Sequence, residues 1–108
     1  MTSEWQAVPG YPAYEVHPDG QVRSVHRAVK GRDSSERNIA GKILTPTVRP
    51  SGVSAVNLWR GNSCRQIPLR EVVLTTFDRP KPAGFEALNI NGDLSDNRLG
   101  NLRWQRVT

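Results

Sequence analysis

One stretch near the C-terminus constrains the fold of this chain more than any other. Apolar residues recur through it while asparagine, aspartate and glycine fill the positions between them: Ala87-Leu88-Asn89-Ile90-Asn91-Gly92-Asp93-Leu94-Ser95-Asp96-Asn97-Arg98-Leu99-Gly100-Asn101-Leu102-Arg103-Trp104. Asn91-Gly92 after a short apolar run predicts a tight turn, because both residues accept a positive φ at low steric cost. Leu99, Leu102 and Trp104 are then expected to anchor the returning chain in a core.

Two interpretations of this loop remain open from the residues alone. In the first, its side-chain amides cap backbone groups within a polar hairpin loop and have no further role. In the second, the loop holds a metal ion or a phosphate group. Asn97 and Asn101 are four residues apart, so they would share one face if this part formed a helical turn.

Length and cysteine content limit the class of protein. A chain of 108 residues predicts one domain with a modest core. The single cysteine, Cys64, excludes an internal disulfide and a multi-cysteine zinc site. There is no long apolar run and the N-terminus does not resemble a signal peptide, so we expect a cytoplasmic protein without a membrane span.

Basic residues are concentrated in the middle of the sequence. The net charge is +5 overall, but the region from Arg23 to Arg70 holds ten basic and two acidic residues and therefore carries +8. This asymmetry favours a polyanionic partner. The alternative is a solvated surface that only aids solubility.

Alternating apolar residues and turn signals predict a chain made mostly of antiparallel strands. The expected elements are a strand over 4–8, a hairpin of 14–16 and 21–24 around a Pro-Asp-Gly turn, and sheet strands over 42–45, 53–59 and 65–68. Alternation places Val53, Ala55 and Asn57 on one face of the middle strand, opposite Ser54, Val56 and Leu58. Residues 27–41 are polar, charged and without periodicity, which predicts a flexible loop.

One helix is expected, over residues 69–77. Leu69, Val72, Val73 and Phe77 have helical spacing, and two prolines follow at Pro80 and Pro82. A proline-rich link then leads into the C-terminal loop. The fold class is therefore α+β, with small antiparallel sheets, hairpins and one main helix.

The order of these motifs resembles that of the small HNH homing-type endonucleases of phages and bacteria. The resemblance rests on Trp5, Pro9-Gly10, Tyr14-Glu15-Val16, Gly20-Gln21-Val22-Arg23-Ser24, Gly41-Lys42-Ile43-Leu44, Phe77, Asn91-Gly92, Asn97-Arg98-Leu99, Asn101-Leu102 and Trp104. It implies a single HNH-like domain in which residues 1–45 form a nuclease-associated modular part and residues 46–108 form the HNH core, with a truncated ββα-metal motif.

The resemblance also assigns positions to the catalytic machinery. In that family a histidine deprotonates the attacking water, and one divalent cation stabilises the phosphate and the leaving oxygen. With Gly92 and Asn101 aligned, the histidine position is Asn89 and the neighbouring metal-ligand position is Leu88. A further histidine, at the start of the preceding helix, corresponds to Leu69. Asn101 matches the asparagine that orients the base.

This sequence departs from the family at those positions. Asn89 has no basic site at neutral pH, and Leu88 cannot coordinate a cation. The chain ends at Thr108, where the family continues into the helix that supplies the last metal ligand. We therefore expect no catalytic residues, with Leu69, Asn89 and Asn101 vestigial. No metal site and no cofactor are expected, with Mg²⁺ relevant only if residual nuclease activity exists.

The leading hypothesis is a non-catalytic, phage-encoded protein derived from an HNH endonuclease, which binds DNA in a bacterial host cell. Phosphate contacts are expected from Arg23, Arg27, Lys42, Arg49, Arg60, Arg65 and Arg70. Trp59 either stacks on a base or joins the core, while His17 and His26 are expected in turns or at the surface.

Two alternatives belong to other classes of function. One is an inhibitor or regulator that binds a host or defence protein. The other is an active nickase with an unusual ligand set, Asp93, Asp96 and Asn97.

Overall fold

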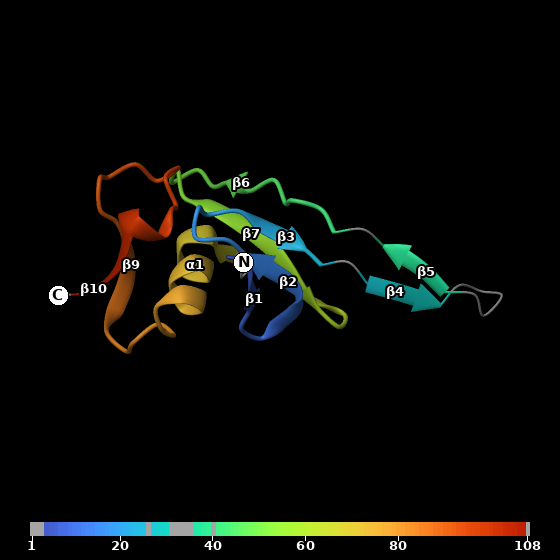
Figure 1. Cartoon of the computed structure of the whole chain (residues 1–108). Helices are drawn as coiled ribbons and strands as arrows, with labels where there is room; N and C mark the ends of the chain where they lie inside the picture. The colour runs from blue at the N-terminus through green and yellow to red at the C-terminus, as the bar shows by residue number, and fades with distance from the viewer. Residues whose placement is uncertain (1–3, 26, 31–35, 40, 108) are drawn as a thin grey trace.

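Helix α1, the one α-helix in the described part of the chain, lies between two groups of strands (Figure 1). The computed structural model describes residues 4–25, 27–30, 36–39 and 41–107, and only the backbone of 27–30 and 36–39. The elements are β1 (Gln6–Val8), β2 (Tyr11–Val16), β3 (Val22–Ser24), β4 (Arg27–Lys30), β5 (Glu36–Ile39), β6 (Thr47–Val48), β7 (Ser54–Arg60), β8 (Ser63–Pro68), α1 (Leu69–Phe77), β9 (Phe85–Asn89), the 3-10 turn η1 (Leu99–Asn101) and β10 (Leu102–Arg106). The predicted α+β fold with small antiparallel sheets and one helix is confirmed.

The first sheet has the strand order β1-β2-β3 and contains the predicted hairpin. Strands β2 and β3 pair from Tyr14 with Ser24 to Val16 with Val22. The turn that joins them ends at Gly20, which has a φ of +95°. Because only glycine adopts this conformation without strain, the Pro-Asp-Gly sequence determines the position of the turn.

The second sheet has the order β6-β7-β8. Val56 and Leu58 of β7 are buried, and Asn57 between them is exposed, as alternation predicts. Ala55 lies on the opposite face from Val56 and is nevertheless fully buried. Trp59, for which a core position remained open, is 54% exposed.

Helix α1 begins directly after strand β8, as its apolar spacing predicts. Pro68 immediately precedes it with an extended conformation, at a φ of −55° and a ψ of 132°. Leu69, Val72, Val73 and Leu74 of the helix are buried. The backbone N–H groups of the two residues that follow Phe77 both donate to the Leu74 carbonyl, and the proline at position 80 disfavours further helix.

One hydrophobic core joins the two halves of the sequence. Its buried residues are Val8, Tyr14, Val16, Val22, Val56, Leu58, Leu69, Val72, Val73, Leu74, Ala87 and Leu102. Side chains from the β1-β2-β3 sheet, the β7 strand, helix α1 and the β9–β10 hairpin therefore pack together. The expected modular part, 1–45, and the expected HNH core, 46–108, both contribute to it.

The C-terminal stretch forms a β-hairpin with a long loop. Strands β9 and β10 pair from Phe85 with Arg106 to Asn89 with Leu102, so residues 90–101 form the loop. The predicted turn at Asn91-Gly92 is present, because the Gly92 N–H donates to the Asn89 carbonyl at 2.9 Å and Gly92 has a φ of +80°. Asn97 and Asn101 do not share a helix, since the only helical turn in the loop is η1.

Two predictions of local structure were wrong. Residues 27–41 were predicted to form a loop, but β4 and β5 pair in an antiparallel ribbon that extends away from the helix (Figure 1). Residues 31–35 and 40 of this segment lie outside the described part of the chain. Residues 42–45 form only an isolated bridge, between Ile43 and Arg23, instead of a strand. Pro46, which has no N–H group, follows them, and the strand of this region is β6.

No helix in the described part of the chain is long and apolar enough to cross a membrane.

Candidate functional site

The side chain of Asn89, at the end of strand β9, is buried, and both its amide nitrogen and its oxygen form hydrogen bonds. It is 2% exposed. Its Nδ2 donates to the Asp96 carbonyl at 2.9 Å and to Oδ1 of Asn97 at 3.2 Å, and its Oδ1 accepts from Nη1 of Arg70 at 3.0 Å. Both amide hydrogens are thus used within the protein. Asn89 holds the loop against the helix.

Asn101 closes the same loop from its other end. Its Nδ2 donates to Oδ1 of Asn91 at 3.0 Å and to the Asp96 carbonyl at 2.9 Å. Its Oδ1 accepts from the Asn91 backbone N–H at 3.0 Å. The Asp96 carbonyl therefore receives hydrogen bonds from two buried asparagines, 89 and 101. Three of these contacts are with backbone groups, as the capping interpretation predicts, and the other three are with the side chains of Arg70, Asn97 and Asn91.

The two carboxylates of the loop are paired with neighbours along the chain. The Arg98 guanidinium donates to both oxygens of Asp96, at 2.8 and 2.9 Å, and lowers the pKa of that carboxyl to about 2. The hydroxyl of Ser95 donates to Oδ1 of Asp93 at 2.6 Å and lowers the pKa of Asp93. Asn97, the third member of the hypothetical nickase set, is buried and bonded to Asn89 and to the Leu94 carbonyl.

Arg70 lies in the first turn of α1 and places a positive charge beside Asn89. Its Nη1 donates to Asn89, while its Nε is buried without a hydrogen-bond partner. A fixed cation at this position disfavours a divalent metal ion nearby. Among the described residues, no group of three or more His, Cys, Asp or Glu side chains could hold one.

In the described part of the chain, neither Leu69 nor His17 forms a side-chain hydrogen bond with the asparagines of the loop. Leu69 is 4% exposed and belongs to the core. His17 is partly buried in the β2–β3 turn, where its Nε2 lies 3.1 Å from a carboxylate oxygen of Glu4 and its Nδ1 accepts from the Asp19 N–H. This agrees with the predicted turn role of His17. His26 lies outside the described residues.

Among the predicted phosphate-contacting residues whose side chains are described, Arg70, Arg23 and Arg49 donate side-chain hydrogen bonds within the protein. Arg70 binds Asn89, as described. Arg23 donates to Glu15 at 2.8 Å and lies 4.0 Å above the Trp5 ring. Arg49 donates from Nε to the side chain of Gln66 at 2.8 Å.

The remaining members of the set differ in their surroundings. Lys42, Arg60 and Arg65 are exposed. Arg60 approaches the Tyr11 ring, with its guanidinium carbon 6.0 Å from the ring centroid. The side chain of Arg27 is outside the described part of the structure, although its backbone belongs to β4.

The turn between β2 and β3 packs against the C-terminal loop, a contact that the sequence did not predict. The Leu99 N–H donates to the Pro18 carbonyl at 2.7 Å. A Cβ atom placed on Gly20 would lie 2.8 Å from the Asn97 carbonyl oxygen. The only sequence signal for this contact is Gly20, and its presence is already explained by the turn between β2 and β3. The N-terminal hairpin therefore helps to position the loop that carries Asn97.

This arrangement of a helix against a β-hairpin with a long loop defines the class of the fold. The fold of this chain is that of about half of an HNH homing endonuclease. The similar structure is that of I-HmuI, which was solved in a study of its DNA binding and cleavage. The TM-score is 0.76 and the sequence identity is 23%. The similarity covers 96% of this chain and 53% of the I-HmuI chain. This chain thus spans about half the length of that endonuclease.

The family follows from the N-terminal half of the sequence. The family model of the NUMOD4 motif matches residues 4–59, just over half of the chain. The protein therefore belongs to the NUMOD4 motif family. No curated protein matches the sequence. The matched residues include the β1-β2-β3 sheet and all of β7 up to Trp59.

Proposed function

We propose that this protein binds duplex DNA without cleaving it, as a degenerate derivative of the HNH endonuclease fold. The observation that carries the proposal is the hydrogen-bonded state of Asn89, whose two amide hydrogens are bound within the loop and whose oxygen accepts from Arg70. An amide has no basic site that could take a proton from water. The position that the endonucleases use for their base has a structural role in this chain.

Two further features support the absence of cleavage. The adjacent family ligand position is Leu88, which offers no donor atom to a cation. The Arg70 guanidinium beside Asn89 adds a repulsive charge for Mg²⁺ or Mn²⁺. A general base alone contributes roughly 10²–10⁴-fold in rate, and the metal site contributes further. We therefore infer that Asn89, Asn101 and Leu69 are vestigial.

DNA binding is proposed on the basis of charge and family. The central region carries +8, and I-HmuI, which shares the fold, binds DNA. Lys42, Arg60 and Arg65 are exposed and able to reach phosphate oxygens, and we propose them as the principal contacts. The proposed set is completed by Arg23, Arg27, Arg49 and Arg70.

The two proposed parts of the chain, 1–45 and 46–108, are inferred to bind as one unit. They share the core and are joined by the contact of Gly20 with the Asn97 loop. The proposal includes a phage origin and a location in the bacterial cytoplasm, where duplex DNA is accessible.

Titration of a fluorescent DNA duplex at two salt concentrations tests the proposal. Neutralised phosphates release counterions, so the logarithm of the binding constant should fall linearly with the logarithm of the salt concentration, by roughly 0.9 per phosphate contact. Binding that is absent at low salt, or indifferent to salt, would contradict DNA binding.

A pull-down from nuclease-treated host lysate separates this function from that of a protein inhibitor. Proteins that the chain bridges through nucleic acid should be lost after nuclease treatment. A stoichiometric protein that remains bound would instead support the inhibitor hypothesis.

A further inference from the structure

Trp59 is a large aromatic side chain that the fold leaves on its surface. The residue before it, Leu58, is fully buried, so strand alternation turns the Trp59 side chain away from the core. Its cross-strand partner is the exposed Cys64. The indole is 54% exposed although burial of an aromatic ring is strongly favourable. Such a ring is available to a ligand.

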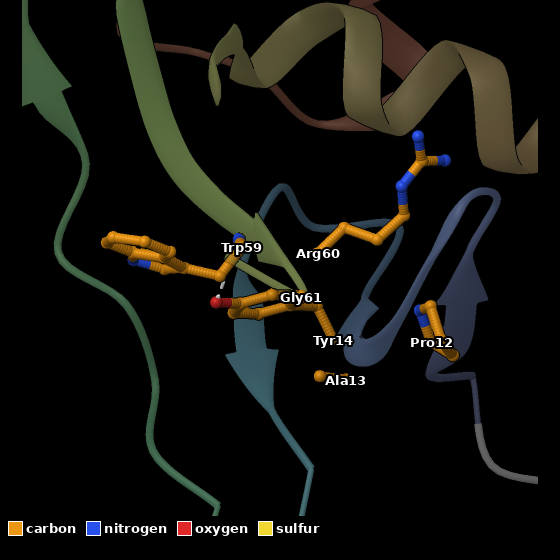
Figure 2. A pocket seen from close by; sticks show the side chains of 6 residues that line it. All are labelled: Pro12, Ala13, Tyr14, Trp59, Arg60 and Gly61. Atoms are coloured by element: carbon orange, nitrogen blue, oxygen red, sulfur yellow. Dashed lines mark hydrogen bonds between the residues drawn. The ribbon is translucent and has the colours of Figure 1, made fainter. Parts of the chain in front are cut away.

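The backbone beneath this indole is held rigidly. The Trp59 N–H donates to the hydroxyl of Tyr14 at 3.2 Å, and the dashed line in Figure 2 marks this bond. Tyr14 is itself a core residue with 8% exposure. Strand β7 is thus fixed to β2 at the residue that carries the exposed ring. A backbone that is already held in place has less conformational entropy to lose when a ligand binds the side chain it carries.

An open cavity lies beside Trp59. Its volume is about 440 Å³, within the range of roughly 300–1,000 Å³ typical of small-ligand sites. The residues that line it are Pro12, Ala13, Tyr14, Trp59, Arg60 and Gly61 (Figure 2). The side chains of Trp59 and Arg60 leave the strand in different directions in this view.

Two amides and one arginine lie further along the face of the sheet that carries the ring. Asn57, two residues before Trp59 and therefore roughly 7 Å along the strand, pairs with Gln66. Gln66 in turn accepts a hydrogen bond from the Arg49 guanidinium. Strands β6, β7 and β8 are fully described and contain no acidic residue. An anionic strand would therefore meet no repulsive charge along this sheet.

We propose that Trp59 is a stacking site for an unpaired base of a nucleic-acid strand, with Arg49 as the neighbouring phosphate contact. Bases stack on exposed aromatic rings in many proteins that bind single strands, and basic side chains beside the ring hold the backbone. A base within a duplex is already stacked on both faces, so the ligand must be unpaired or flipped out. A single ring among amides and arginine fits a base better than a broad apolar protein surface. This inference rests on the proposed DNA binding and adds to it a preference for DNA that carries unpaired bases.

Two oligonucleotides test the site: a blunt duplex and the same duplex with a short overhang of unpaired thymines. Fluorescence anisotropy at one fixed salt concentration measures the affinity of each for the wild-type protein and for Trp59→Ala. Trp59→Ala should weaken binding to the overhang duplex about 5- to 150-fold and leave blunt-duplex affinity unchanged. Trp59→Phe should retain most of the overhang affinity. Ile43→Ala, at another exposed apolar residue outside this sheet, is the matched control.

The outcomes separate this inference from the proposed function. Wild-type affinity of Trp59→Ala for both oligonucleotides would overturn the stacking site while DNA binding stands. Equal losses on both would also overturn it, because the ring would then contact the duplex itself. A change in sedimentation of the free protein on substitution of Trp59 would identify an interface between copies and overturn it too. Failure of the wild-type protein to bind either oligonucleotide at low salt would reject the proposed function, and the stacking site with it.

Discussion

The guanidinium of Arg70 donates a hydrogen bond of 3.0 Å to the side-chain oxygen of Asn89, across the contact between helix α1 and strand β9. A residue expected to face a phosphate thus supports Asn89, to which the resemblance to HNH endonucleases assigns the position of the catalytic base. The amide accepts this hydrogen bond without being ionised, whereas a histidine in the same place would face a permanent positive charge. The hydrogen bond joins the end of strand β9 to the first turn of the helix.

Substitution of Asn89 by histidine should destabilise the protein without creating a nuclease. A neutral imidazole has one N–H group, so it cannot donate to both the Asp96 carbonyl and Asn97. The unmade hydrogen bond should reduce the free energy of unfolding by about 1–3 kcal/mol, measured by urea denaturation.

Plasmid relaxation in Mg²⁺ or Mn²⁺ gives the activity result for the same variant. Neither Asn89→His nor the unmodified protein should nick the plasmid, because Leu88 and Arg70 do not favour a cation. Asn57→His, at an exposed strand position, is the control for stability. Nicking by the unmodified protein would contradict the proposed function.

Removal of the Asn101 side chain should open the loop. Asn101→Ala leaves the Asp96 carbonyl with one fewer donor and the Asn91 backbone N–H without its acceptor. We expect a loss of roughly 2–6 kcal/mol in the free energy of unfolding, from about 1–3 kcal/mol for each of the two affected groups. Asn57→Ala should change it by less than about 0.5 kcal/mol. Equal effects of the two substitutions would show that the loop amides contribute no stability.

Gly20→Ala should be more damaging than alanine at another glycine of positive φ. The new Cβ would lie 2.8 Å from the Asn97 carbonyl oxygen, whereas a Cβ on Gly92, with a φ of +80°, meets nothing within 4 Å. Gly92→Ala should therefore cost only the left-handed backbone strain of about 1–2 kcal/mol. Gly20→Ala should add about 1–3 kcal/mol of overpacking. Thermal unfolding of both variants measures the difference, and similar midpoints would contradict the contact.

The ion pair of Asp96 with Arg98 should make stability depend on pH in the acid range. The folded-state pKa of Asp96 is about 2, below its ordinary value of 3.8, so the unfolded chain takes up the proton first as the pH falls. The stabilisation is complete above pH 3.8 and is lost as the pH falls towards 2. The difference in unfolding midpoint between wild type and Asp96→Asn should shrink across this window. Glu86→Gln, at an exposed position outside the loop, is the control; a constant difference would contradict the assignment.

The exposed central basic residues should determine the salt dependence of DNA binding. Alanine at Lys42, Arg60 or Arg65 should each reduce the slope of log affinity against log salt by about 0.9 if the residue contacts one phosphate. Arg103→Ala is the charge-matched control, because this exposed residue of β10 lies outside the central region. A slope that falls equally for Arg103→Ala would indicate a general charge effect and no defined interface.

Much of the local structure was predictable because it depends on short-range pattern. The helix from Leu69 to Phe77 follows from apolar spacing and the prolines beyond it, and the β2–β3 hairpin follows from alternation around Gly20. The turn at Gly92 needs only a residue that accepts positive φ. By contrast, the β4–β5 ribbon was missed, because its polar and charged residues show no alternation of apolar positions.

The sequence by itself determined the order of the elements, the position of the tight turns and the absence of a basic group at Asn89. Only the tertiary structure decided what these residues contact. Asn89 meets Arg70 from the helix, Asn97 meets Gly20 from the first hairpin, and Trp59 is left outside the core. The reason is physical: turns and helices depend on neighbours along the chain, whereas a buried amide or an exposed ring is defined by partners that are distant in sequence and brought close only by the shared core.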